Sequence, residues 1–155
     1  MAKMTSSMIL TNEMAGSGID WAHVLADIPL FAELSPRHVR SIAKLARIQR
    51  IAPYTQIVTL DDQADSFYIL IEGTVVVRPP GKRLVKLGPG EYFGELALLD
   101  DSPRTATVEA GDEVVVARIK RTDFNRMLKN EPAIALNLLR TLAKRLRASE
   151  ASPVH

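Results

Sequence analysis

The chain of 155 residues contains no cysteine, which excludes disulfides, thiolate zinc ligands and cysteine nucleophiles. A chain without thiols is compatible with a reducing compartment, and we expect a cytoplasmic protein. Histidine is also scarce: only His23, His38 and His155 occur, and none lies in a segment expected to form a strand. Because a metal site inside a β-barrel takes several ligands from its strands, no metal cofactor is expected.

Long hydrophobic runs are missing as well. No apolar run approaches the roughly 20 residues that cross a bilayer, and the apolar residues 8–10 are too few for the core of a signal peptide. The formal net charge is only +2, which by itself does not indicate a nucleic-acid binder. We therefore expect neither a membrane nor nucleic acid among the partners. Hydrophobic residues make up 46% of the chain and charged residues 25%, a composition typical of a folded domain.

The N-terminal part predicts an arm followed by two helices. Residues 1–19 are mostly small and polar, and we expect a flexible arm. Asp20 can cap a short helix that ends near Pro29, because proline disfavours helical backbone in the residue before it. Ser35 is a good N-cap for a second helix within residues 34–48, where apolar residues recur at helical spacing.

The middle of the chain has the pattern of a β domain. Short runs rich in β-branched residues alternate with turn signals at intervals of about ten residues, which predicts a sandwich or barrel. Gly73 interrupts an apolar run and predicts a bend or bulge. No helical pattern of a dozen residues separates the runs, which argues against a parallel sheet. The predicted strands lie within residues 55–60, 66–77, 83–93, 104–110 and 113–119.

Helices return at the C-terminus. Thr122 can cap a helix over residues 122–130, and a longer helix follows Pro132 to about Ala148. Residues 149–155 are expected to be a flexible tail. The order of helices, β core and helices predicts an α+β fold, an antiparallel jelly-roll-like β-roll with helices outside it. The apolar stripe expected to bury the long helix consists of Ala135, Leu138, Leu139, Leu142 and Leu146.

One stretch, FGELALLDDSPRTATV at residues 93–108, breaks the strand pattern. Its segment GELALL predicts a short helix, whose first turn leaves N–H groups available to an anion. Gly94 allows close approach of the backbone, and Arg104 can direct two N–H donors at a phosphate. Glu95 can accept a hydrogen bond from a sugar hydroxyl. The stretch therefore suggests a site for a ribose and its phosphate.

A plain ion pair between Glu95 and Arg104 is the alternative. An exposed pair contributes about 0–1 kcal/mol, which does not explain the glycine, the small residues Ala97 and Ala106, and the interrupted strand together. On the chemistry of these residues alone, both interpretations stay open.

The same stretch closely resembles the phosphate-binding cassette of cyclic nucleotide-binding domains. This family includes the regulatory subunits of protein kinase A, nucleotide-gated channels and catabolite-activator-type regulators. The resemblance also covers the C-terminal helices and three further segments, so that it spans about residues 20–148. These segments are IPLFAELSPRHVRSIA, FYILIEGTVVV and LGPGEYFGE. It implies a β-roll with flanking N-terminal helices and with C-terminal hinge and lid helices.

The resemblance also implies roles for individual residues. Arg104 matches the arginine on the cyclic phosphate, and Glu95 matches the glutamate on the ribose 2′-hydroxyl. Val85, on the strand before the cassette, is a candidate for apolar contact with the base. Some family members have a lid-helix arginine that covers the purine, and Arg145 lies near that place, although it can also belong to a solvated basic face of the helix. A hydroxyl at Thr105 can hold a guanine in the syn conformation, although it can equally be an ordinary strand threonine. The rest of the expected cradle consists of Phe93, Gly94, Leu96, Ala97, Thr105 and Ala106.

The implied function is that of a cyclic-nucleotide sensor, with cAMP favoured over cGMP and with binding coupled to movement of the C-terminal helices. No enzyme activity is expected, since no activated nucleophile accompanies Glu95. The output requires an unknown downstream protein, self-association as a homodimer, or nucleotide buffering. Two alternatives remain: a fragment of a catabolite-activator-type transcription regulator without its helix-turn-helix, and a protein-interaction module that binds no ligand.

Overall fold

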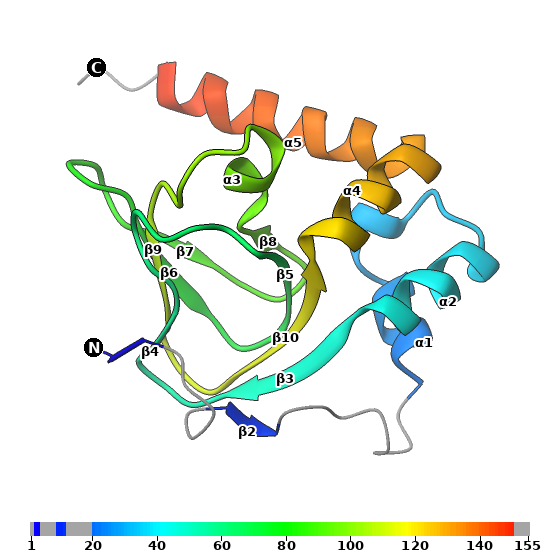
Figure 1. Ribbon diagram of the computed structural model, residues 1–155, viewed down its shortest axis with the longest axis horizontal. Coiled ribbons are helices and arrows are strands. Elements are labelled where there is room, and N and C mark those ends of the chain that lie inside the picture. Colours follow the sequence, from blue (N-terminus) through cyan, green and yellow to red (C-terminus); the bar gives the residue numbers. More distant parts are fainter. Residues whose placement is uncertain (1, 4–8, 12–19, 151–155) are drawn as a thin grey trace.

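Two five-stranded sheets wrap around each other in the computed structural model, which describes residues 2–3, 9–11 and 20–150 (Figure 1). Neighbouring strands run antiparallel, except that β1 lies parallel to β4. The sheet orders are β1-β4-β9-β6-β7 and β2-β3-β10-β5-β8. The strands are β1 (Ala2–Lys3), β2 (Ile9–Thr11), β3 (Arg47–Ile51), β4 (Thr55–Val58), β5 (Ser66–Glu72), β6 (Val75–Arg78), β7 (Val85–Leu87), β8 (Tyr92–Phe93), β9 (Thr107–Ala110) and β10 (Val114–Lys120).

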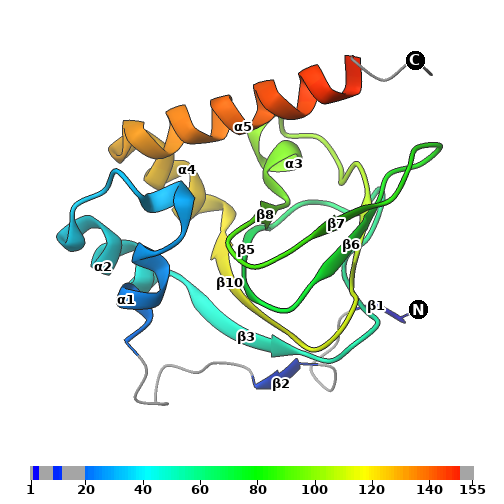
Figure 2. The ribbon, with the colours of Figure 1, turned by 180° about the vertical axis from the view of Figure 1, so that it is seen from behind.

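The helices gather on one side of the roll, and α5 lies across its end above α3 (Figures 1 and 2). This arrangement confirms the predicted α+β fold. Asp20 caps the first helix by accepting from the backbone N–H of His23, and Ser35 caps the second by accepting from that of His38. The helices are α1 (Trp21–Ala26), the 3₁₀ turn η1 (Pro29–Phe31), α2 (Pro36–Leu45), α3 (Glu95–Leu99), α4 (Arg121–Asn130) and α5 (Pro132–Glu150).

The central strand β10 begins with four consecutive apolar residues, Val114 to Ala117, because both of its faces are covered. Val114 and Val116 pack into the interior of the roll, whereas Val115, Ala117 and Ile119 pack against the helices. Side chains alternate between the faces of a strand, so a sheet with both faces covered takes apolar residues at every position. The roll interior and the helix layer are therefore two hydrophobic clusters that share this sheet.

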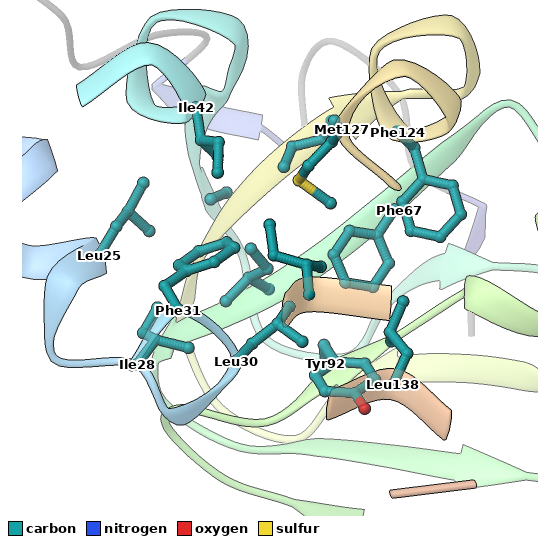
Figure 3. Packing of buried hydrophobic residues seen from close by; sticks show 14 of the residues in the cluster. Leu25, Ile28, Leu30, Phe31, Ile42, Phe67, Tyr92, Phe124, Met127 and Leu138 are labelled. Atoms are coloured by element: carbon teal, nitrogen blue, oxygen red, sulfur yellow. The ribbon is translucent and has the colours of Figure 1, made fainter. Parts of the chain in front are cut away.

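Aromatic rings join the helix layer to the sheet (Figure 3). The ring centroid of Phe67, on β5, lies 4.9 Å from that of Phe124 on α4 and 5.5 Å from that of Tyr92 on β8. Leu138 of α5 and Leu30 of η1 belong to the same buried cluster. The position of α4 and α5 on the roll therefore depends on packing with residues far away in the sequence.

Two predicted boundaries are wrong. The segment around Arg47, placed in a helix by its spacing, is the start of β3, because residues 47–51 pair with β10. Helix α4 begins at Arg121 with Lys120 as N-cap residue, so Thr122 is not its cap. In both cases the boundary depends on how the segment pairs with or packs on other parts of the same chain, and local sequence does not determine it.

The predicted buried face of α5 is wrong in part, since Leu138 is buried and Ala135 and Leu142 are half-buried, but the other two members of the stripe face solvent. Ile134 and Leu138 are its buried residues, whereas Leu139 and Leu146 are 64% and 60% exposed. The core face turns instead along Ile134, Leu138 and the half-buried Thr141 toward Arg145. Leu139 and Leu146 thus lie on a different side of the helix from the side that packs.

The ends of the chain are described only in part. Within the predicted arm, residues 2–3 and 9–11 form the short strands β1 and β2, and the rest of residues 1–19 lies outside the described residues. Helix α5 extends to Glu150, beyond the predicted end at Ala148. The remainder of the predicted tail, residues 151–155, also lies outside the described part.

Gly73 supplies a test of the turn between β5 and β6. Its φ is +83°, and a Cβ atom there would lie 2.5 Å from the carbonyl oxygen of Glu113. Gly73→Ala should lower the free energy of unfolding by about 2–4 kcal/mol in urea titrations, because left-handed strain and a backbone clash combine. Gly81→Ala is the matched control, since φ is +67° but no atom lies within 4 Å of the added Cβ. Equal losses in both variants would contradict the clash.

Candidate functional site

A cavity of about 610 Å³ opens between the roll and α5. Strands β6, β7 and β9, helix α3 and the end of α5 contribute its walls. Its volume falls within the range of small-molecule sites. The structure brings all ten predicted site residues to this one cavity: Val85, Phe93, Gly94, Glu95, Leu96, Ala97, Arg104, Thr105, Ala106 and Arg145. Their roles toward a ligand remain predictions.

Gly94 starts the short helix that forms one wall. It is the N-cap of α3, with φ +90° in the left-handed region. A Cβ atom at this position would lie 2.9 Å from Nη1 of Arg104 and 3.3 Å from the carbonyl oxygen of Ser66. Only glycine fits here without strain, because both the backbone angle and the close approach exclude a side chain. Glu95, Leu96 and Ala97, the first turn of α3, therefore reach the cavity wall.

Arg104 lies beneath this turn and is only 5% exposed. Its Nη1 donates to the carbonyl oxygen of Gly94 at 2.9 Å, and its Nη2 donates to that of Ser66 at 2.7 Å. Burial lowers the pKa of Arg104, whereas Tyr68 and Asp65 act in the opposite direction. A guanidinium has five N–H donors and stays protonated in proteins, so the two carbonyls leave donors for an anion in the cavity.

Asp65 braces the guanidinium from the side. Its Oδ1 lies 4.0 Å from Nη2 of Arg104, and its Oδ2 accepts from Arg118 at 3.1 Å. Arg118 in turn donates to the hydroxyl of Ser66 at 2.7 Å. These contacts hold Arg104 in one orientation, which is the condition for a preorganised anion site.

Glu95 pairs with helix α5. Its carboxylate is almost fully buried, at 2% residue exposure, and accepts from Nη1 of Arg145 at 2.8 Å. The guanidinium of Arg145 also lies 5.4 Å from the ring centroid of Tyr92, within the range of a cation–π contact. The alternative predicted from the sequence, an ion pair between Glu95 and Arg104, is not what forms. Glu95 pairs with Arg145 instead, and Arg104 donates to backbone carbonyls.

Burial raises the pKa of Glu95, and Arg145 only opposes that shift. A buried carboxylate costs stability when it ionises, so it favours the fold most when protonated. Its stabilising contribution is therefore fully present below the pKa of an unfolded glutamate, about 4.3, and is lost as pH rises through the raised pKa of the folded state.

Some cavity residues were missed by the sequence reasoning. Lys82 and Arg83 lie on the turn between β6 and β7, and Tyr92 and Ala148 complete the wall near α5. The sequence places Arg83 at the start of the strand predicted over residues 83–93 and Lys82 directly before it, and it gives neither residue a role at the site. No local pattern connects them to α3, because the pairing of β6 with β7 and β9 brings this turn to the cavity.

Other kinds of site are not seen in the described part of the chain. Residues 20–148 hold no group of three or more side chains able to bind a metal ion. Nε2 of His38, on α2, lies 3.6 Å from Oε1 of Glu131, the residue that follows α4. Among the helices described, none has the length and hydrophobicity needed to span a bilayer.

Glu95→Gln tests the buried carboxylate. Glutamine imitates the protonated acid, so the variant should gain stability relative to the wild type as pH rises from about 4 to 7. The free energy of unfolding from urea titrations at several pH values measures the difference. Glu113→Gln, at an exposed carboxylate that pairs with Arg50, is the matched control. A difference for Glu95→Gln that is constant over this pH range would contradict the assignment.

Comparisons with known proteins identify the family to which this domain belongs. The family model of the cyclic nucleotide-binding domain matches residues 48–131, more than half of the chain. A cyclic nucleotide-gated potassium channel of Mesorhizobium japonicum is 33% identical over 83% of the chain and 36% of its own length. A cAMP-dependent protein kinase regulatory subunit of Debaryomyces hansenii is 34% identical over 81% of the chain and 28% of its own length.

A solved structure agrees with both relatives. The regulatory domain of Toxoplasma gondii PKA, crystallised with cAMP, superposes with a TM-score of 0.70 at 27% identity, over 81% of this chain and 49% of that one. The chain thus spans about a third of the length of the two curated relatives. The matched model describes a binding domain and not a catalytic one. The chain belongs to the cyclic nucleotide-binding domain family.

Proposed function

We propose that this protein is a cyclic-nucleotide sensor that binds cAMP in the cavity between α3 and α5. The observation that carries the proposal is the buried Arg104, which keeps free donors beside the first turn of α3 and opposite Glu95 in one cavity. A cyclic phosphate is a compact anion, and an arginine with preorganised neighbours binds such a group strongly. No catalytic step is part of this function.

The ribose would lie at Glu95. In the structure this carboxylate is satisfied by Arg145, whose side chain is 41% exposed. A sugar hydroxyl that donates to Glu95 can replace that bond, because Arg145 has access to water and loses little when released. The base would then lie toward Val85 and the end of α5, beyond the mostly apolar wall that includes Val77 and Leu87.

The preference for cAMP rests on relatives, whereas Thr105 is the residue that could favour cGMP. The regulatory subunit from Debaryomyces hansenii is named as cAMP-dependent, and the Toxoplasma gondii domain was crystallised with cAMP. Thr105 lines the cavity directly after Arg104, where a hydroxyl can accept or donate one hydrogen bond to a purine. We assign cAMP as the main ligand and cGMP as the competing one.

Coupling to the C-terminal helices would run through two contacts. Arg145 ties α5 to Glu95, and Arg121, the first residue of α4, pairs with Asp101 in the turn after α3. Arg121 also donates to the carbonyl oxygen of Ala64 at 2.7 Å. A nucleotide that takes Glu95 from Arg145 favours a different position of α5, and it can shift the equilibrium only by binding one position more tightly.

Calorimetric titration with cAMP, cGMP and 5′-AMP tests the function. Arg104→Ala should weaken cAMP binding by about 2–5 kcal/mol, as expected when one partner of a buried charge pair is removed. Because the same change strands the carbonyls of Gly94 and Ser66, circular dichroism must show that the variant is folded. Arg104→Lys keeps a positive charge, and Arg50→Ala removes an arginine outside the cavity.

The outcomes separate clearly. Binding of cAMP that survives in Arg50→Ala and is lost in folded Arg104→Ala supports the proposal. Wild-type protein that gives no heat and no thermal shift with either cyclic nucleotide contradicts it, since a ligand at about 100 times its Kd adds about 2.7 kcal/mol of stability. In that case the fold would serve protein contacts without a ligand.

Thr105→Ala tests nucleotide preference separately. If its hydroxyl bonds to guanine, the variant should lose about three- to tenfold in cGMP affinity relative to cAMP, the value of one hydrogen bond. Thr105→Ser keeps the hydroxyl and should keep the wild-type ratio. Competition between the two nucleotides for the same protein measures this ratio, and an unchanged ratio in Thr105→Ala would remove Thr105 as a discriminator.

A further inference from the structure

The outer face of α5 carries an apolar stripe whose side chains are exposed. Leu136, Leu139 and Leu146 are 44%, 64% and 60% exposed, and Ala143 between them is exposed as well. Figures 1 and 2 show α5 on the outside of the molecule along its whole length. Clusters of exposed apolar side chains on one surface typically mark an interaction site.

The inner face of α5 is occupied, so the helix cannot simply rotate to bury this stripe. Ile134 and Leu138 are in the hydrophobic core, and Asn137 donates to the carbonyl oxygen of Leu30 at 3.2 Å. Arg145 is held by Glu95. An α-helix has 3.6 residues per turn, so Ile134, Leu138 and Arg145 lie on one side of α5 and Ala143 lies on the opposite side.

The spacing of the stripe is that of a helix–helix seam. Leu136, Leu139, Ala143 and Leu146 follow intervals of three, four and three residues, the pattern of the a and d positions of a heptad. A seam of this kind takes a second helix whose own apolar residues fit between these side chains. The partner expected from shape is therefore an amphipathic helix.

The residues beside the seam determine its charge. In the same register the two e positions are Arg140 and Arg147, both exposed, and the neighbouring g positions are Ala135 and Leu142. No acidic residue occurs between Glu131 and Glu150. Arg140 lies 3.6 Å from Glu33, but both side chains are more than half exposed, and such a pair contributes little.

These charges disfavour a second copy of this chain as the partner. Two antiparallel copies would place e positions against each other, and thus arginine against arginine. Two parallel copies would place the arginines against Ala135 and Leu142, with no opposite charge. Residues at e and g set partner choice in paired helices, so a partner with acidic residues there fits best.

A membrane surface fits less well. Helices that lie on anionic membranes commonly combine basic residues with tryptophan or phenylalanine among their apolar residues. The stripe on α5 contains only leucine and alanine, and its arginines line one edge alone.

We propose that the outer face of α5, formed by Leu136, Leu139, Ala143, Leu146, Arg140 and Arg147, binds an acidic amphipathic helix of another protein. The helix would place leucine or isoleucine in the seam and aspartate or glutamate opposite Arg140 and Arg147. This inference does not depend on which nucleotide fills the cavity, or on whether one does.

A designed peptide of about three heptads tests this surface. It has leucine at a and d and glutamate at e and g, so its own charges keep it from pairing with itself, and a matched peptide has lysine instead of glutamate. Fluorescence anisotropy of each labelled peptide, titrated with the whole chain, should show at least about tenfold tighter binding of the glutamate peptide. Leu139→Ser should weaken that binding by about tenfold.

Two further variants give the test its specificity. Leu84→Ser removes an exposed leucine, 49% accessible, between β6 and β7 and should bind the peptide as the wild type does. The double change Arg140→Glu with Arg147→Glu should reverse the preference toward the lysine peptide. All these side chains are exposed, and unchanged thermal unfolding would verify that each variant keeps its fold.

Several results would overturn the proposal. Equal binding of both peptides, or binding insensitive to Leu139→Ser, would show that the stripe and its arginines do not select an acidic helix. Sedimentation that finds a dimer of the chain, dissociated by Leu139→Ser, would make a second copy the occupant. Binding to phosphatidylserine vesicles that depends on Leu139, without peptide binding, would assign the stripe to a membrane.

Discussion

A guanidinium buried in a protein needs acceptors, and the cassette of this domain depends on how Arg104 obtains them. Two backbone carbonyls, of Gly94 and Ser66, and the carboxylate of Asp65 surround it. Gly94 can present its carbonyl there because its left-handed backbone turns the chain into α3 without a side chain in the way. The strand, the turn and the short helix therefore take their positions around one cation.

The second charged group of the site, Glu95, has a different kind of partner. Glu95 is as buried as Arg104, but its partner Arg145 belongs to a helix at the far end of the chain and is partly exposed. One charge is thus held by the rigid roll, and the other by an element that is joined to the roll mainly through side chains. A pair of this second kind can exchange partners at small cost, because water takes up the released guanidinium.

Helix α5 connects the cavity to the outside of the molecule. One side carries Leu138 in the core and Arg145 on Glu95, and the other side carries the leucine stripe with its arginines. Whatever occupies the cavity and whatever covers the stripe act on the same rigid helix. Such a common element is the physical requirement for two sites to influence each other.

Much of the fold could be predicted because its signals are local. The caps at Asp20 and Ser35, the bend at Gly73 and the short helix after Gly94 each depend on a few neighbouring residues, and all are confirmed. The strand at residues 47–51 could not be predicted in this way. Its residues have helical spacing, and only pairing with β10 makes them a strand.

By itself the sequence determined the cassette, the order of helices and strands, and therefore the family, because these depend on residue types at short spacing. The tertiary structure alone decided that Glu95 pairs with Arg145, that the turn after β6 reaches the cavity, and that three leucines of α5 face outward. These leucines are Leu136, Leu139 and Leu146. The physical reason is that each of these contacts joins segments far apart in the sequence. Strand pairing brings the turn after β6 to the cavity. Amphipathic spacing says only that a helix has an apolar side, whereas the docking of Ile134 and Leu138 against the sheet sets the rotation of α5.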